Sequence, residues 1–145
     1  MSTTPANLDE ARAELNRRCN AIEEAYEFML AYAAQGLTTD EGSQRGGQVR
    51  EFLRRCDQGL TDLGTFLRGF ITQIDAEPAP YEAFIRVLEQ DAQHSQAAVR
   101  LVLAQPGISS ALIDNLNASI HLRALLTDLF LIDEILKAHR SKKSG

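Results

Sequence analysis

Chain breakers at three points divide this sequence into four segments, and that division limits the folds open to it more than any other feature. Gly36, the pair Pro78 and Pro80, and the stretch 105–107 (QPG) each interrupt a run of apolar residues that recur every three or four positions. This spacing places apolar side chains on one face of a helix, whereas Pro ends a helix because it has no N–H donor. The sequence therefore predicts four helices and no strands.

The start signals of these helices are local patterns of capping residues. Asn7 followed by Glu10 is a capping box, Thr38 followed by Glu41 repeats it, and Ser109 is a suitable N-cap for the last segment. The predicted helices cover residues 8–35, 39–75, 80–104 and 110–139. The second segment contains several glycines, and each destabilises a helix interior by about 1 kcal/mol relative to Ala. We therefore expect looped or frayed first turns there.

Short connections between consecutive helices favour packing between neighbours, so the fold class we predict is all-α, an antiparallel four-helix bundle that self-associates. A length of 145 residues with 44% hydrophobic residues fits a single domain with its own core. We place that domain at residues 7–139 and assign residues 140–145 to a basic tail.

The charge of the chain argues against nucleic acid as a partner. Its net charge is −5, and residues 1–136 carry all 20 acids against 11 arginines. Proteins that bind nucleic acid instead have a clustered basic surface that meets the phosphates. We expect no nucleic-acid partner.

The sequence also lacks the features of a membrane or secreted protein. Its first 15 residues contain no charged start followed by an apolar run, and the most apolar stretch, 120–136, is interrupted by His121, Arg123 and Asp128. We therefore expect no membrane insertion and a cytoplasmic location. Two cysteines in such a protein are expected to be reduced thiols.

A simple hairpin register predicts a polar layer in the middle of the bundle. If the first hairpin turns near residues 37–38, Ile22 lies level with Leu53, and Cys19 with Cys56. A second turn near residue 106 brings Asp91 level with His121. The residues expected in one layer are Arg18, Cys19, Cys56, Asp57, Asp91 and His121.

Four residues of this layer, Cys19, Cys56, Asp91 and His121, have side chains that zinc accepts as ligands, in the usual number. They support an alternative hypothesis, a metal or redox bundle, ferritin-like in architecture, that holds a zinc or iron ion. The same residues also fit a layer without metal, because cysteine is common in cores and a buried aspartate can pair with arginine or histidine. Di-iron bundles need two Glu-x-x-His pairs, and this chain offers a single imperfect copy at Asp91 and His94.

The last predicted helix is apolar around almost its whole circumference between residues 120 and 136. Such a helix must be buried on all sides, either at an interface with another subunit or at the centre of its own chain. The interface hypothesis assigns the contact to Leu122, Leu125, Leu129, Phe130, Ile132 and Leu136.

No motif in the sequence names a reaction. We therefore predict a non-enzymatic protein without a cofactor, which forms a homodimer and binds a further, unidentified protein partner in an adaptor, assembly or regulatory role. The metal-binding bundle is the alternative, and it depends on the four residues named above.

Overall fold

The computed structural model describes residues 7–42 and 44–139, so the predicted basic tail at 140–145 lies outside the described residues. This part of the chain is all-helical, as the sequence predicts, and none of its helices is long and apolar enough to cross a membrane. The helices are α1 (Leu8–Ala33), α2 (Gln44–Leu60), α3 (Leu63–Ile71), α4 (Pro78–Leu103), α5 (Ser110–Asn117) and α6 (Ile120–Lys137).

Two of the four predicted helices are each broken into two. The segment predicted at 39–75 begins only at Gln44 and breaks at Asp62, whose φ of 56° lies in the left-handed region. The segment predicted at 110–139 breaks at Ala118 and Ser119. A left-handed backbone is costly for residues other than Gly, although Asn and Asp tolerate it best. Neither break follows a proline, which is why the apolar spacing alone did not predict it.

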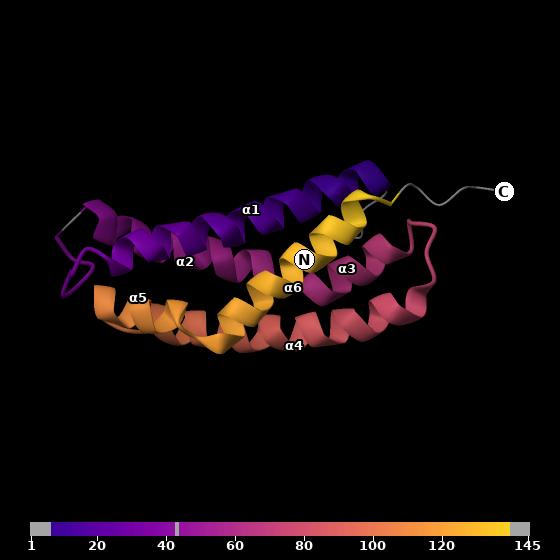
Figure 1. Cartoon of the computed structure of the whole chain (residues 1–145). Coiled ribbons are helices and arrows are strands. Elements are labelled where there is room, and N and C mark those ends of the chain that lie inside the picture. The colour runs from indigo at the N-terminus through magenta and orange to yellow at the C-terminus, as the bar shows by residue number, and fades with distance from the viewer. Residues whose placement is uncertain (1–6, 43, 140–145) are drawn as a thin grey trace.

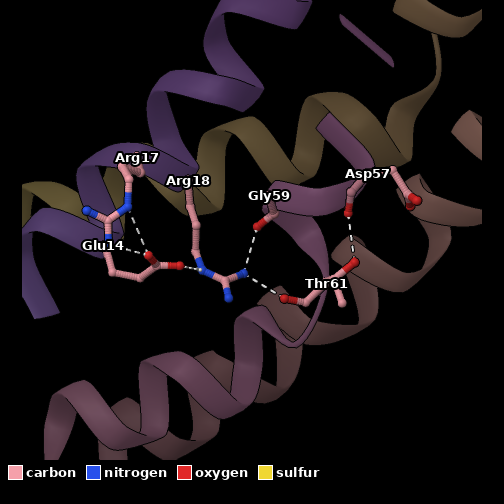
Figure 2. A network of polar contacts seen from close by, with 6 residues as sticks. All are labelled: Glu14, Arg17, Arg18, Asp57, Gly59 and Thr61. Atoms are coloured by element: carbon pink, nitrogen blue, oxygen red, sulfur yellow. Dashed lines mark hydrogen bonds and ion pairs between the residues drawn. The ribbon is translucent and has the colours of Figure 1, made fainter. Parts of the chain in front are cut away.

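The break after α2 is held by an arginine from α1. Arg18 donates from Nη1 to the carbonyl oxygens of Gly59 (2.9 Å) and Thr61 (2.6 Å), and the Thr61 hydroxyl donates to the carbonyl of Asp57 (2.9 Å; Figure 2). The guanidinium also lies over the Phe66 ring, 5.1 Å from its centroid. The carbonyls left open at the end of α2 are thus satisfied by a cation, which the helix dipole also favours.

The same arrangement occurs at the ends of two other helices. Arg50 of α2 donates to the carbonyls of Leu103 (3.0 Å) and Gln105 (2.8 Å) at the end of α4, and Arg12 of α1 donates to carbonyls at the end of α6. Guanidinium groups suit this position because they offer several N–H donors in a planar fork. Arginines from the first two helices therefore bind the open carbonyls at the C-terminal ends of three other helices.

The arrangement of the helices is visible in Figure 1. The long helices α1 and α4 lie on opposite sides of the molecule, α2 packs between them and contacts both, and α3 packs on α4. Helix α5 packs on α1, while α6 crosses the face of the molecule obliquely, from the α4 side to the beginning of α1. The core between them is apolar and includes stacked rings of Phe28 and Phe52, whose centroids are 4.4 Å apart.

One end of the molecule is closed by contacts between the loop after α1 and the loop before α5. The buried Tyr32 hydroxyl donates to the carbonyl of Ile108 (2.6 Å), and the Ser110 hydroxyl donates to the carbonyl of Tyr32 (2.6 Å). Asp40 accepts from the Ile108 N–H (2.7 Å), and Leu37 exchanges hydrogen bonds with Ser110. We call this set of residues, Tyr32, Leu37, Asp40, Ile108 and Ser110, the loop junction.

Candidate interaction surface

The two cysteines of the predicted polar layer lie in the core and are not brought level. The predicted register places Ile22 level with Leu53. In the structure Ile22 lies against Gly59, six positions further along the chain. The register is shifted because the chain takes turns from residue 34 to residue 42, and α2 starts later than predicted. Both thiols are free and buried, and burial is the main cause that raises the pKa of Cys19 and of Cys56 to about 12. Such thiols are unreactive near neutral pH.

The other two candidate ligands, Asp91 and His121, lie where α4 meets α6. Asp91 contacts Asp128 of α6, not His121, and the exposed His121 ring lies 4.7 Å from the His94 ring between centroids. Among the described residues, no three His, Cys, Asp or Glu side chains lie together in a way that could hold a metal ion. The predicted layer of Cys19, Cys56, Asp91 and His121 is therefore not assembled here.

The remaining members of that layer make structural contacts. The Asp57 carboxylate points away from Arg18 (Figure 2) and accepts from Gln96 (3.1 Å) and Arg100 (2.9 Å) of α4, while Arg18 binds Glu14 (2.8 Å). The predicted register placed Arg18 and Asp57 at one level, but their side chains bind different partners. Each instead joins two helices on its own side of the molecule.

The interface predicted on the last helix is also largely wrong. Five of its six residues are buried in the core of their own chain: Leu122, Leu125, Leu129, Ile132 and Leu136. The sixth, Phe130, is 56% exposed. Helix α6 packs mainly on α4 and more lightly on α1 and α5, while Ile120, Phe130, Leu131 and Ile135 leave part of its apolar circumference exposed. The last helix is therefore neither buried on all sides within its own chain nor free on the face that was assigned to the interface.

A different apolar surface remains open between α4 and α6. Leu131 is 50% exposed and Ile135 is 38% exposed, and both border a groove of about 360 Å³. The lining is almost wholly apolar: Pro80, Tyr81, Phe84, Leu131, Ile132 and Ile135. We call this the α4–α6 groove. Leu131 and Ile135 are not among the six interface residues predicted from the sequence, whereas Tyr81 and Phe84 are half-buried and pack against the core as well as lining the groove.

One end of the α4–α6 groove is fixed by polar contacts. The Tyr81 hydroxyl and Nε2 of His139 lie 2.7 Å apart, which joins the first turn of α4 to the residue just beyond α6. Arg12 of α1 donates to the carbonyls of Leu136 (3.0 Å) and His139. The walls of the groove are therefore held at a set distance at this end.

The other end of the groove adjoins two acids that face each other. Asp91 and Asp128 lie in hydrogen-bonding contact across the two helices, and Oδ2 of Asp128 is buried without a donor among the described residues. Burial and then the neighbouring Asp91 carboxyl raise the pKa of Asp128 to about 7. Two carboxyl groups this close cannot both ionise without a cost in free energy. We call this contact the carboxyl pair.

The charged residues that lie next to the groove residues in the sequence are of both signs and are paired within the chain. Arg86 lies 3.6 Å from Glu82 on α4, and Lys137 lies 3.1 Å from Asp133 on α6. Exposed pairs of this kind contribute little to stability. Each of these two pairs is neutral overall.

A second cavity, of about 350 Å³, lies between α1, α5 and the start of α6. It is more polar than the groove, with Tyr26, Asp114 and Arg123 among its lining residues. Asn117 also borders it, and both polar atoms of its amide are buried without a hydrogen-bond partner among the described residues. An unpaired buried amide has a cost in free energy that an ordered water molecule often offsets.

Comparisons of the chain with protein-family models, with curated proteins and with solved structures found no match. The function is therefore argued from the surface of this chain alone. The α4–α6 groove is the main candidate, because exposed apolar side chains lie beside an apolar hollow there.

Proposed function

We propose that this chain is a non-enzymatic helical protein that forms a homodimer through the α4–α6 groove and, as a dimer, serves as an adaptor, assembly or regulatory module for a further protein. The observation that carries the proposal is the exposure of Leu131 and Ile135 beside an apolar hollow. Contiguous apolar surface of this kind marks interaction sites on soluble proteins.

A second copy of the chain is the occupant that the groove fits best. In a symmetric dimer one patch must supply both the protruding side chains and the hollow that receives them. The groove has both, because Leu131 and Ile135 stand at its edge while Tyr81 and Phe84 line it. Leucine side chains of one copy would then enter the groove of the other.

The charges near the groove are compatible with this pairing. Glu82 with Arg86, and Asp133 with Lys137, are already neutralised in pairs, so two copies meet without an excess of like charge. The whole chain remains acidic, with a net charge of −5, which disfavours a polyanion in the same place.

The finer features of the fold and setting belong to the same proposal. We infer that α1, the pair α2 and α3, α4, and the pair α5 and α6 act as four antiparallel rods of one bundle, with two rods interrupted. The cytoplasm is the compartment we propose, and the free thiols Cys19 and Cys56 support it, since thiols persist in reducing compartments.

The experiment is sedimentation velocity on the untagged protein and on two variants, one with a double substitution and one with a single substitution. Replacing Leu131 and Ile135 by Gln should convert a dimer to a monomer, because it removes the apolar knobs and adds no charge. Phe130→Gln is the control: Phe130 is comparably exposed on the same helix but does not line the groove. Circular dichroism should show that all variants remain helical.

Native mass spectrometry of protein purified without chelator adds a second readout. A dimer near twice 16.0 kDa without added mass supports the proposal. A monomeric wild type, or a dimer that survives the Leu131 and Ile135 changes, overturns it. A mass excess that matches zinc or iron would instead favour the metal-binding alternative.

A further inference from the structure

The carboxyl pair is chemically incomplete if both of its members are ionised. Asp91 of α4 and Asp128 of α6 are in contact, and Oδ2 of Asp128 is buried where no donor reaches it among the described residues. Ionised carboxylates only accept hydrogen bonds, so two of them leave a buried acceptor unsatisfied and two like charges together. A single proton shared by the pair removes both faults, because one carboxyl then donates to the other.

Among the described residues, no cation is paired with Asp91 or Asp128 in place of that proton. Asp91 is the charged group that acts on Asp128 from α4, and His94 of α4 instead contacts His121. From α1, Glu23 faces Asp133, one turn beyond Asp128 along α6.

The charged groups of α5 and of α6 itself are also engaged elsewhere. Asp114 of α5 lines the second cavity together with Arg123, near the start of α6. Lys137, at the other end of α6, pairs with Asp133 (3.1 Å). A proton shared by the two carboxyls neutralises the contact without such a cation.

We infer that Asp91 and Asp128 share one proton that clasps α4 to α6, and that loss of this proton loosens the α4–α6 groove. The regulatory half of this inference rests on the proposed self-association, whereas the shared proton does not. Burial and the Asp91 carboxyl, which raise the pKa of Asp128 to about 7, place the loss in the physiological range.

The carboxyl pair is close enough to the groove to affect its shape. Asp128 precedes Leu131 by three positions on α6, so both lie on the side of the helix that faces α4. On α4, Asp91 follows Phe84 by seven positions, two helical turns along the same face. The far end of the groove stays fixed by Tyr81 and His139. Repulsion at the carboxyl pair would therefore open the groove from one end.

The sign of the pH dependence follows from the direction of the pKa shift. The pKa of Asp128 rises from 3.8 to about 7 on folding, so the folded state holds the proton more tightly. The stabilising contribution is complete below about pH 4, declines as the pH rises, and is lost above about pH 7.

The test is a pH series of thermal unfolding on the groove variant with Gln at positions 131 and 135, so that dimer formation does not contribute. Asp128→Asn keeps a donor for Asp91 without a charge, and Asp75→Asn, at an exposed aspartate, is the control. A His121→Gln background removes the imidazole contact. We expect Tm to fall between about pH 5 and about pH 8, and the slope to lessen with Asp128→Asn but not with Asp75→Asn.

Carbon-13 NMR of the aspartate carboxyls reads the proton directly. One resonance should titrate near neutrality in the parent protein and be absent in Asp128→Asn. If every aspartate carboxyl titrates below about pH 5, or if the slope of Tm is the same in both variants, no proton is shared and the inference is overturned.

The effect on the groove is measured separately by sedimentation equilibrium of the wild type. The dimer dissociation constant should rise by about tenfold between about pH 6 and about pH 8 and stay constant in Asp128→Asn. A wild type that is monomeric at every pH would refute the proposed dimer and leave the shared proton to the NMR result. A dimer with the same affinity at both pH values would refute the link to the groove.

Discussion

The loop junction and the α4–α6 contact hold the molecule together by opposite means. At the loop junction every named polar group meets a partner of the complementary kind, as in the hydrogen bond from Tyr32 to Ile108 at 2.6 Å. At the α4–α6 contact, Asp91 meets Asp128, an acid of the same kind. The first contact is complete at physiological pH, whereas the second needs a proton. The comparison separates a part of the fold that is fixed from a part that depends on conditions.

The two regions should respond to pH with opposite signs. Burial alone would raise the pKa of Asp40, but hydrogen bonds from Arg50 and from the Ile108 N–H outweigh it and hold that pKa below its ordinary value. Asp40 therefore stabilises the folded state above the ordinary pKa of an aspartate, and this stabilisation is lost on acidification. Asp128, with its raised pKa, loses its contribution as the pH rises. Acid thus weakens the loop junction and base weakens the α4–α6 contact.

The largest expected effect tests whether the loop junction is the fixed region. Asp40→Ala removes the acceptor of the Arg50 guanidinium (2.7 Å) and of the Ile108 N–H (2.7 Å), and leaves a partly buried charge unpaired. We expect a loss of about 3–5 kcal/mol in the free energy of unfolding, measured with urea. Asp75→Ala, at an exposed aspartate, should change it by less than about 0.5 kcal/mol. A loss below about 1 kcal/mol for Asp40→Ala would show that the junction is not a main support of the fold.

A smaller effect is expected from two adjacent glycines at the start of α2. A Cβ at Gly46 would lie 1.9 Å from the carbonyl oxygen of Asp40, whereas a Cβ at Gly47 would meet nothing within 4 Å. Gly46→Ala should therefore cost about 1–3 kcal/mol by forcing the loop junction apart. Gly47→Ala should stabilise the protein by about 0.5–1 kcal/mol, since alanine favours a helix. Equal effects in urea unfolding would mean that α2 does not press on Asp40.

The smallest effect is on the rate of thiol labelling, and it compares a cysteine that faces α6 with one that does not. Cys19 faces α6, since Asp133 and Lys137 are α6 charges that act on it, whereas Cys56 is fully buried within α2. In a Cys56→Ala background, labelling of Cys19 at about pH 8 should be several-fold faster with Asp128 present than in Asp128→Asn. Cys56, in a Cys19→Ala background, should label at one slow rate in both.

The labelling experiment has a clear contrary outcome. If Cys19 and Cys56 become accessible together, only global unfolding exposes them, and α6 does not move separately. Comparison at a single pH is needed because the thiolate fraction itself rises with pH, and burial raises the pKa of both thiols to about 12.

The local features of the fold were predictable because their signals lie within a few residues of each other. Asn7 accepts from the Glu10 N–H (2.8 Å) and Ser109 accepts from the Leu112 N–H (3.0 Å), so both predicted N-caps are confirmed. The predicted cap at Thr38 is wrong. The chain turns there instead, and Gly42 with a φ of 81° lies just before α2.

The site was harder to predict because it depends on contacts between distant residues. A turn a few residues longer than assumed shifts the register of α2 relative to α1 along the whole hairpin. Ile22 therefore meets Gly59, and the cysteines do not face each other. The carboxyl pair was missed for the same reason, since the predicted register placed Asp91 beside His121. Its one visible signal was an aspartate at an apolar position of α6, Asp128, in a stretch treated as an interruption.

The contact between Arg12 and the end of α6 joins residues that lie far apart in the sequence. Arg12 binds the carbonyls of Leu136 and His139, which lie 124 and 127 positions further along the chain. The entropy lost on closing a loop grows with its length, so contacts this remote in sequence form after the nearer ones. We expect the pairing of α1 with α2 to precede it, and α6 to dock after the helices that are nearer in sequence have packed. Arg12 thus takes part in one of the last contacts that we expect to form.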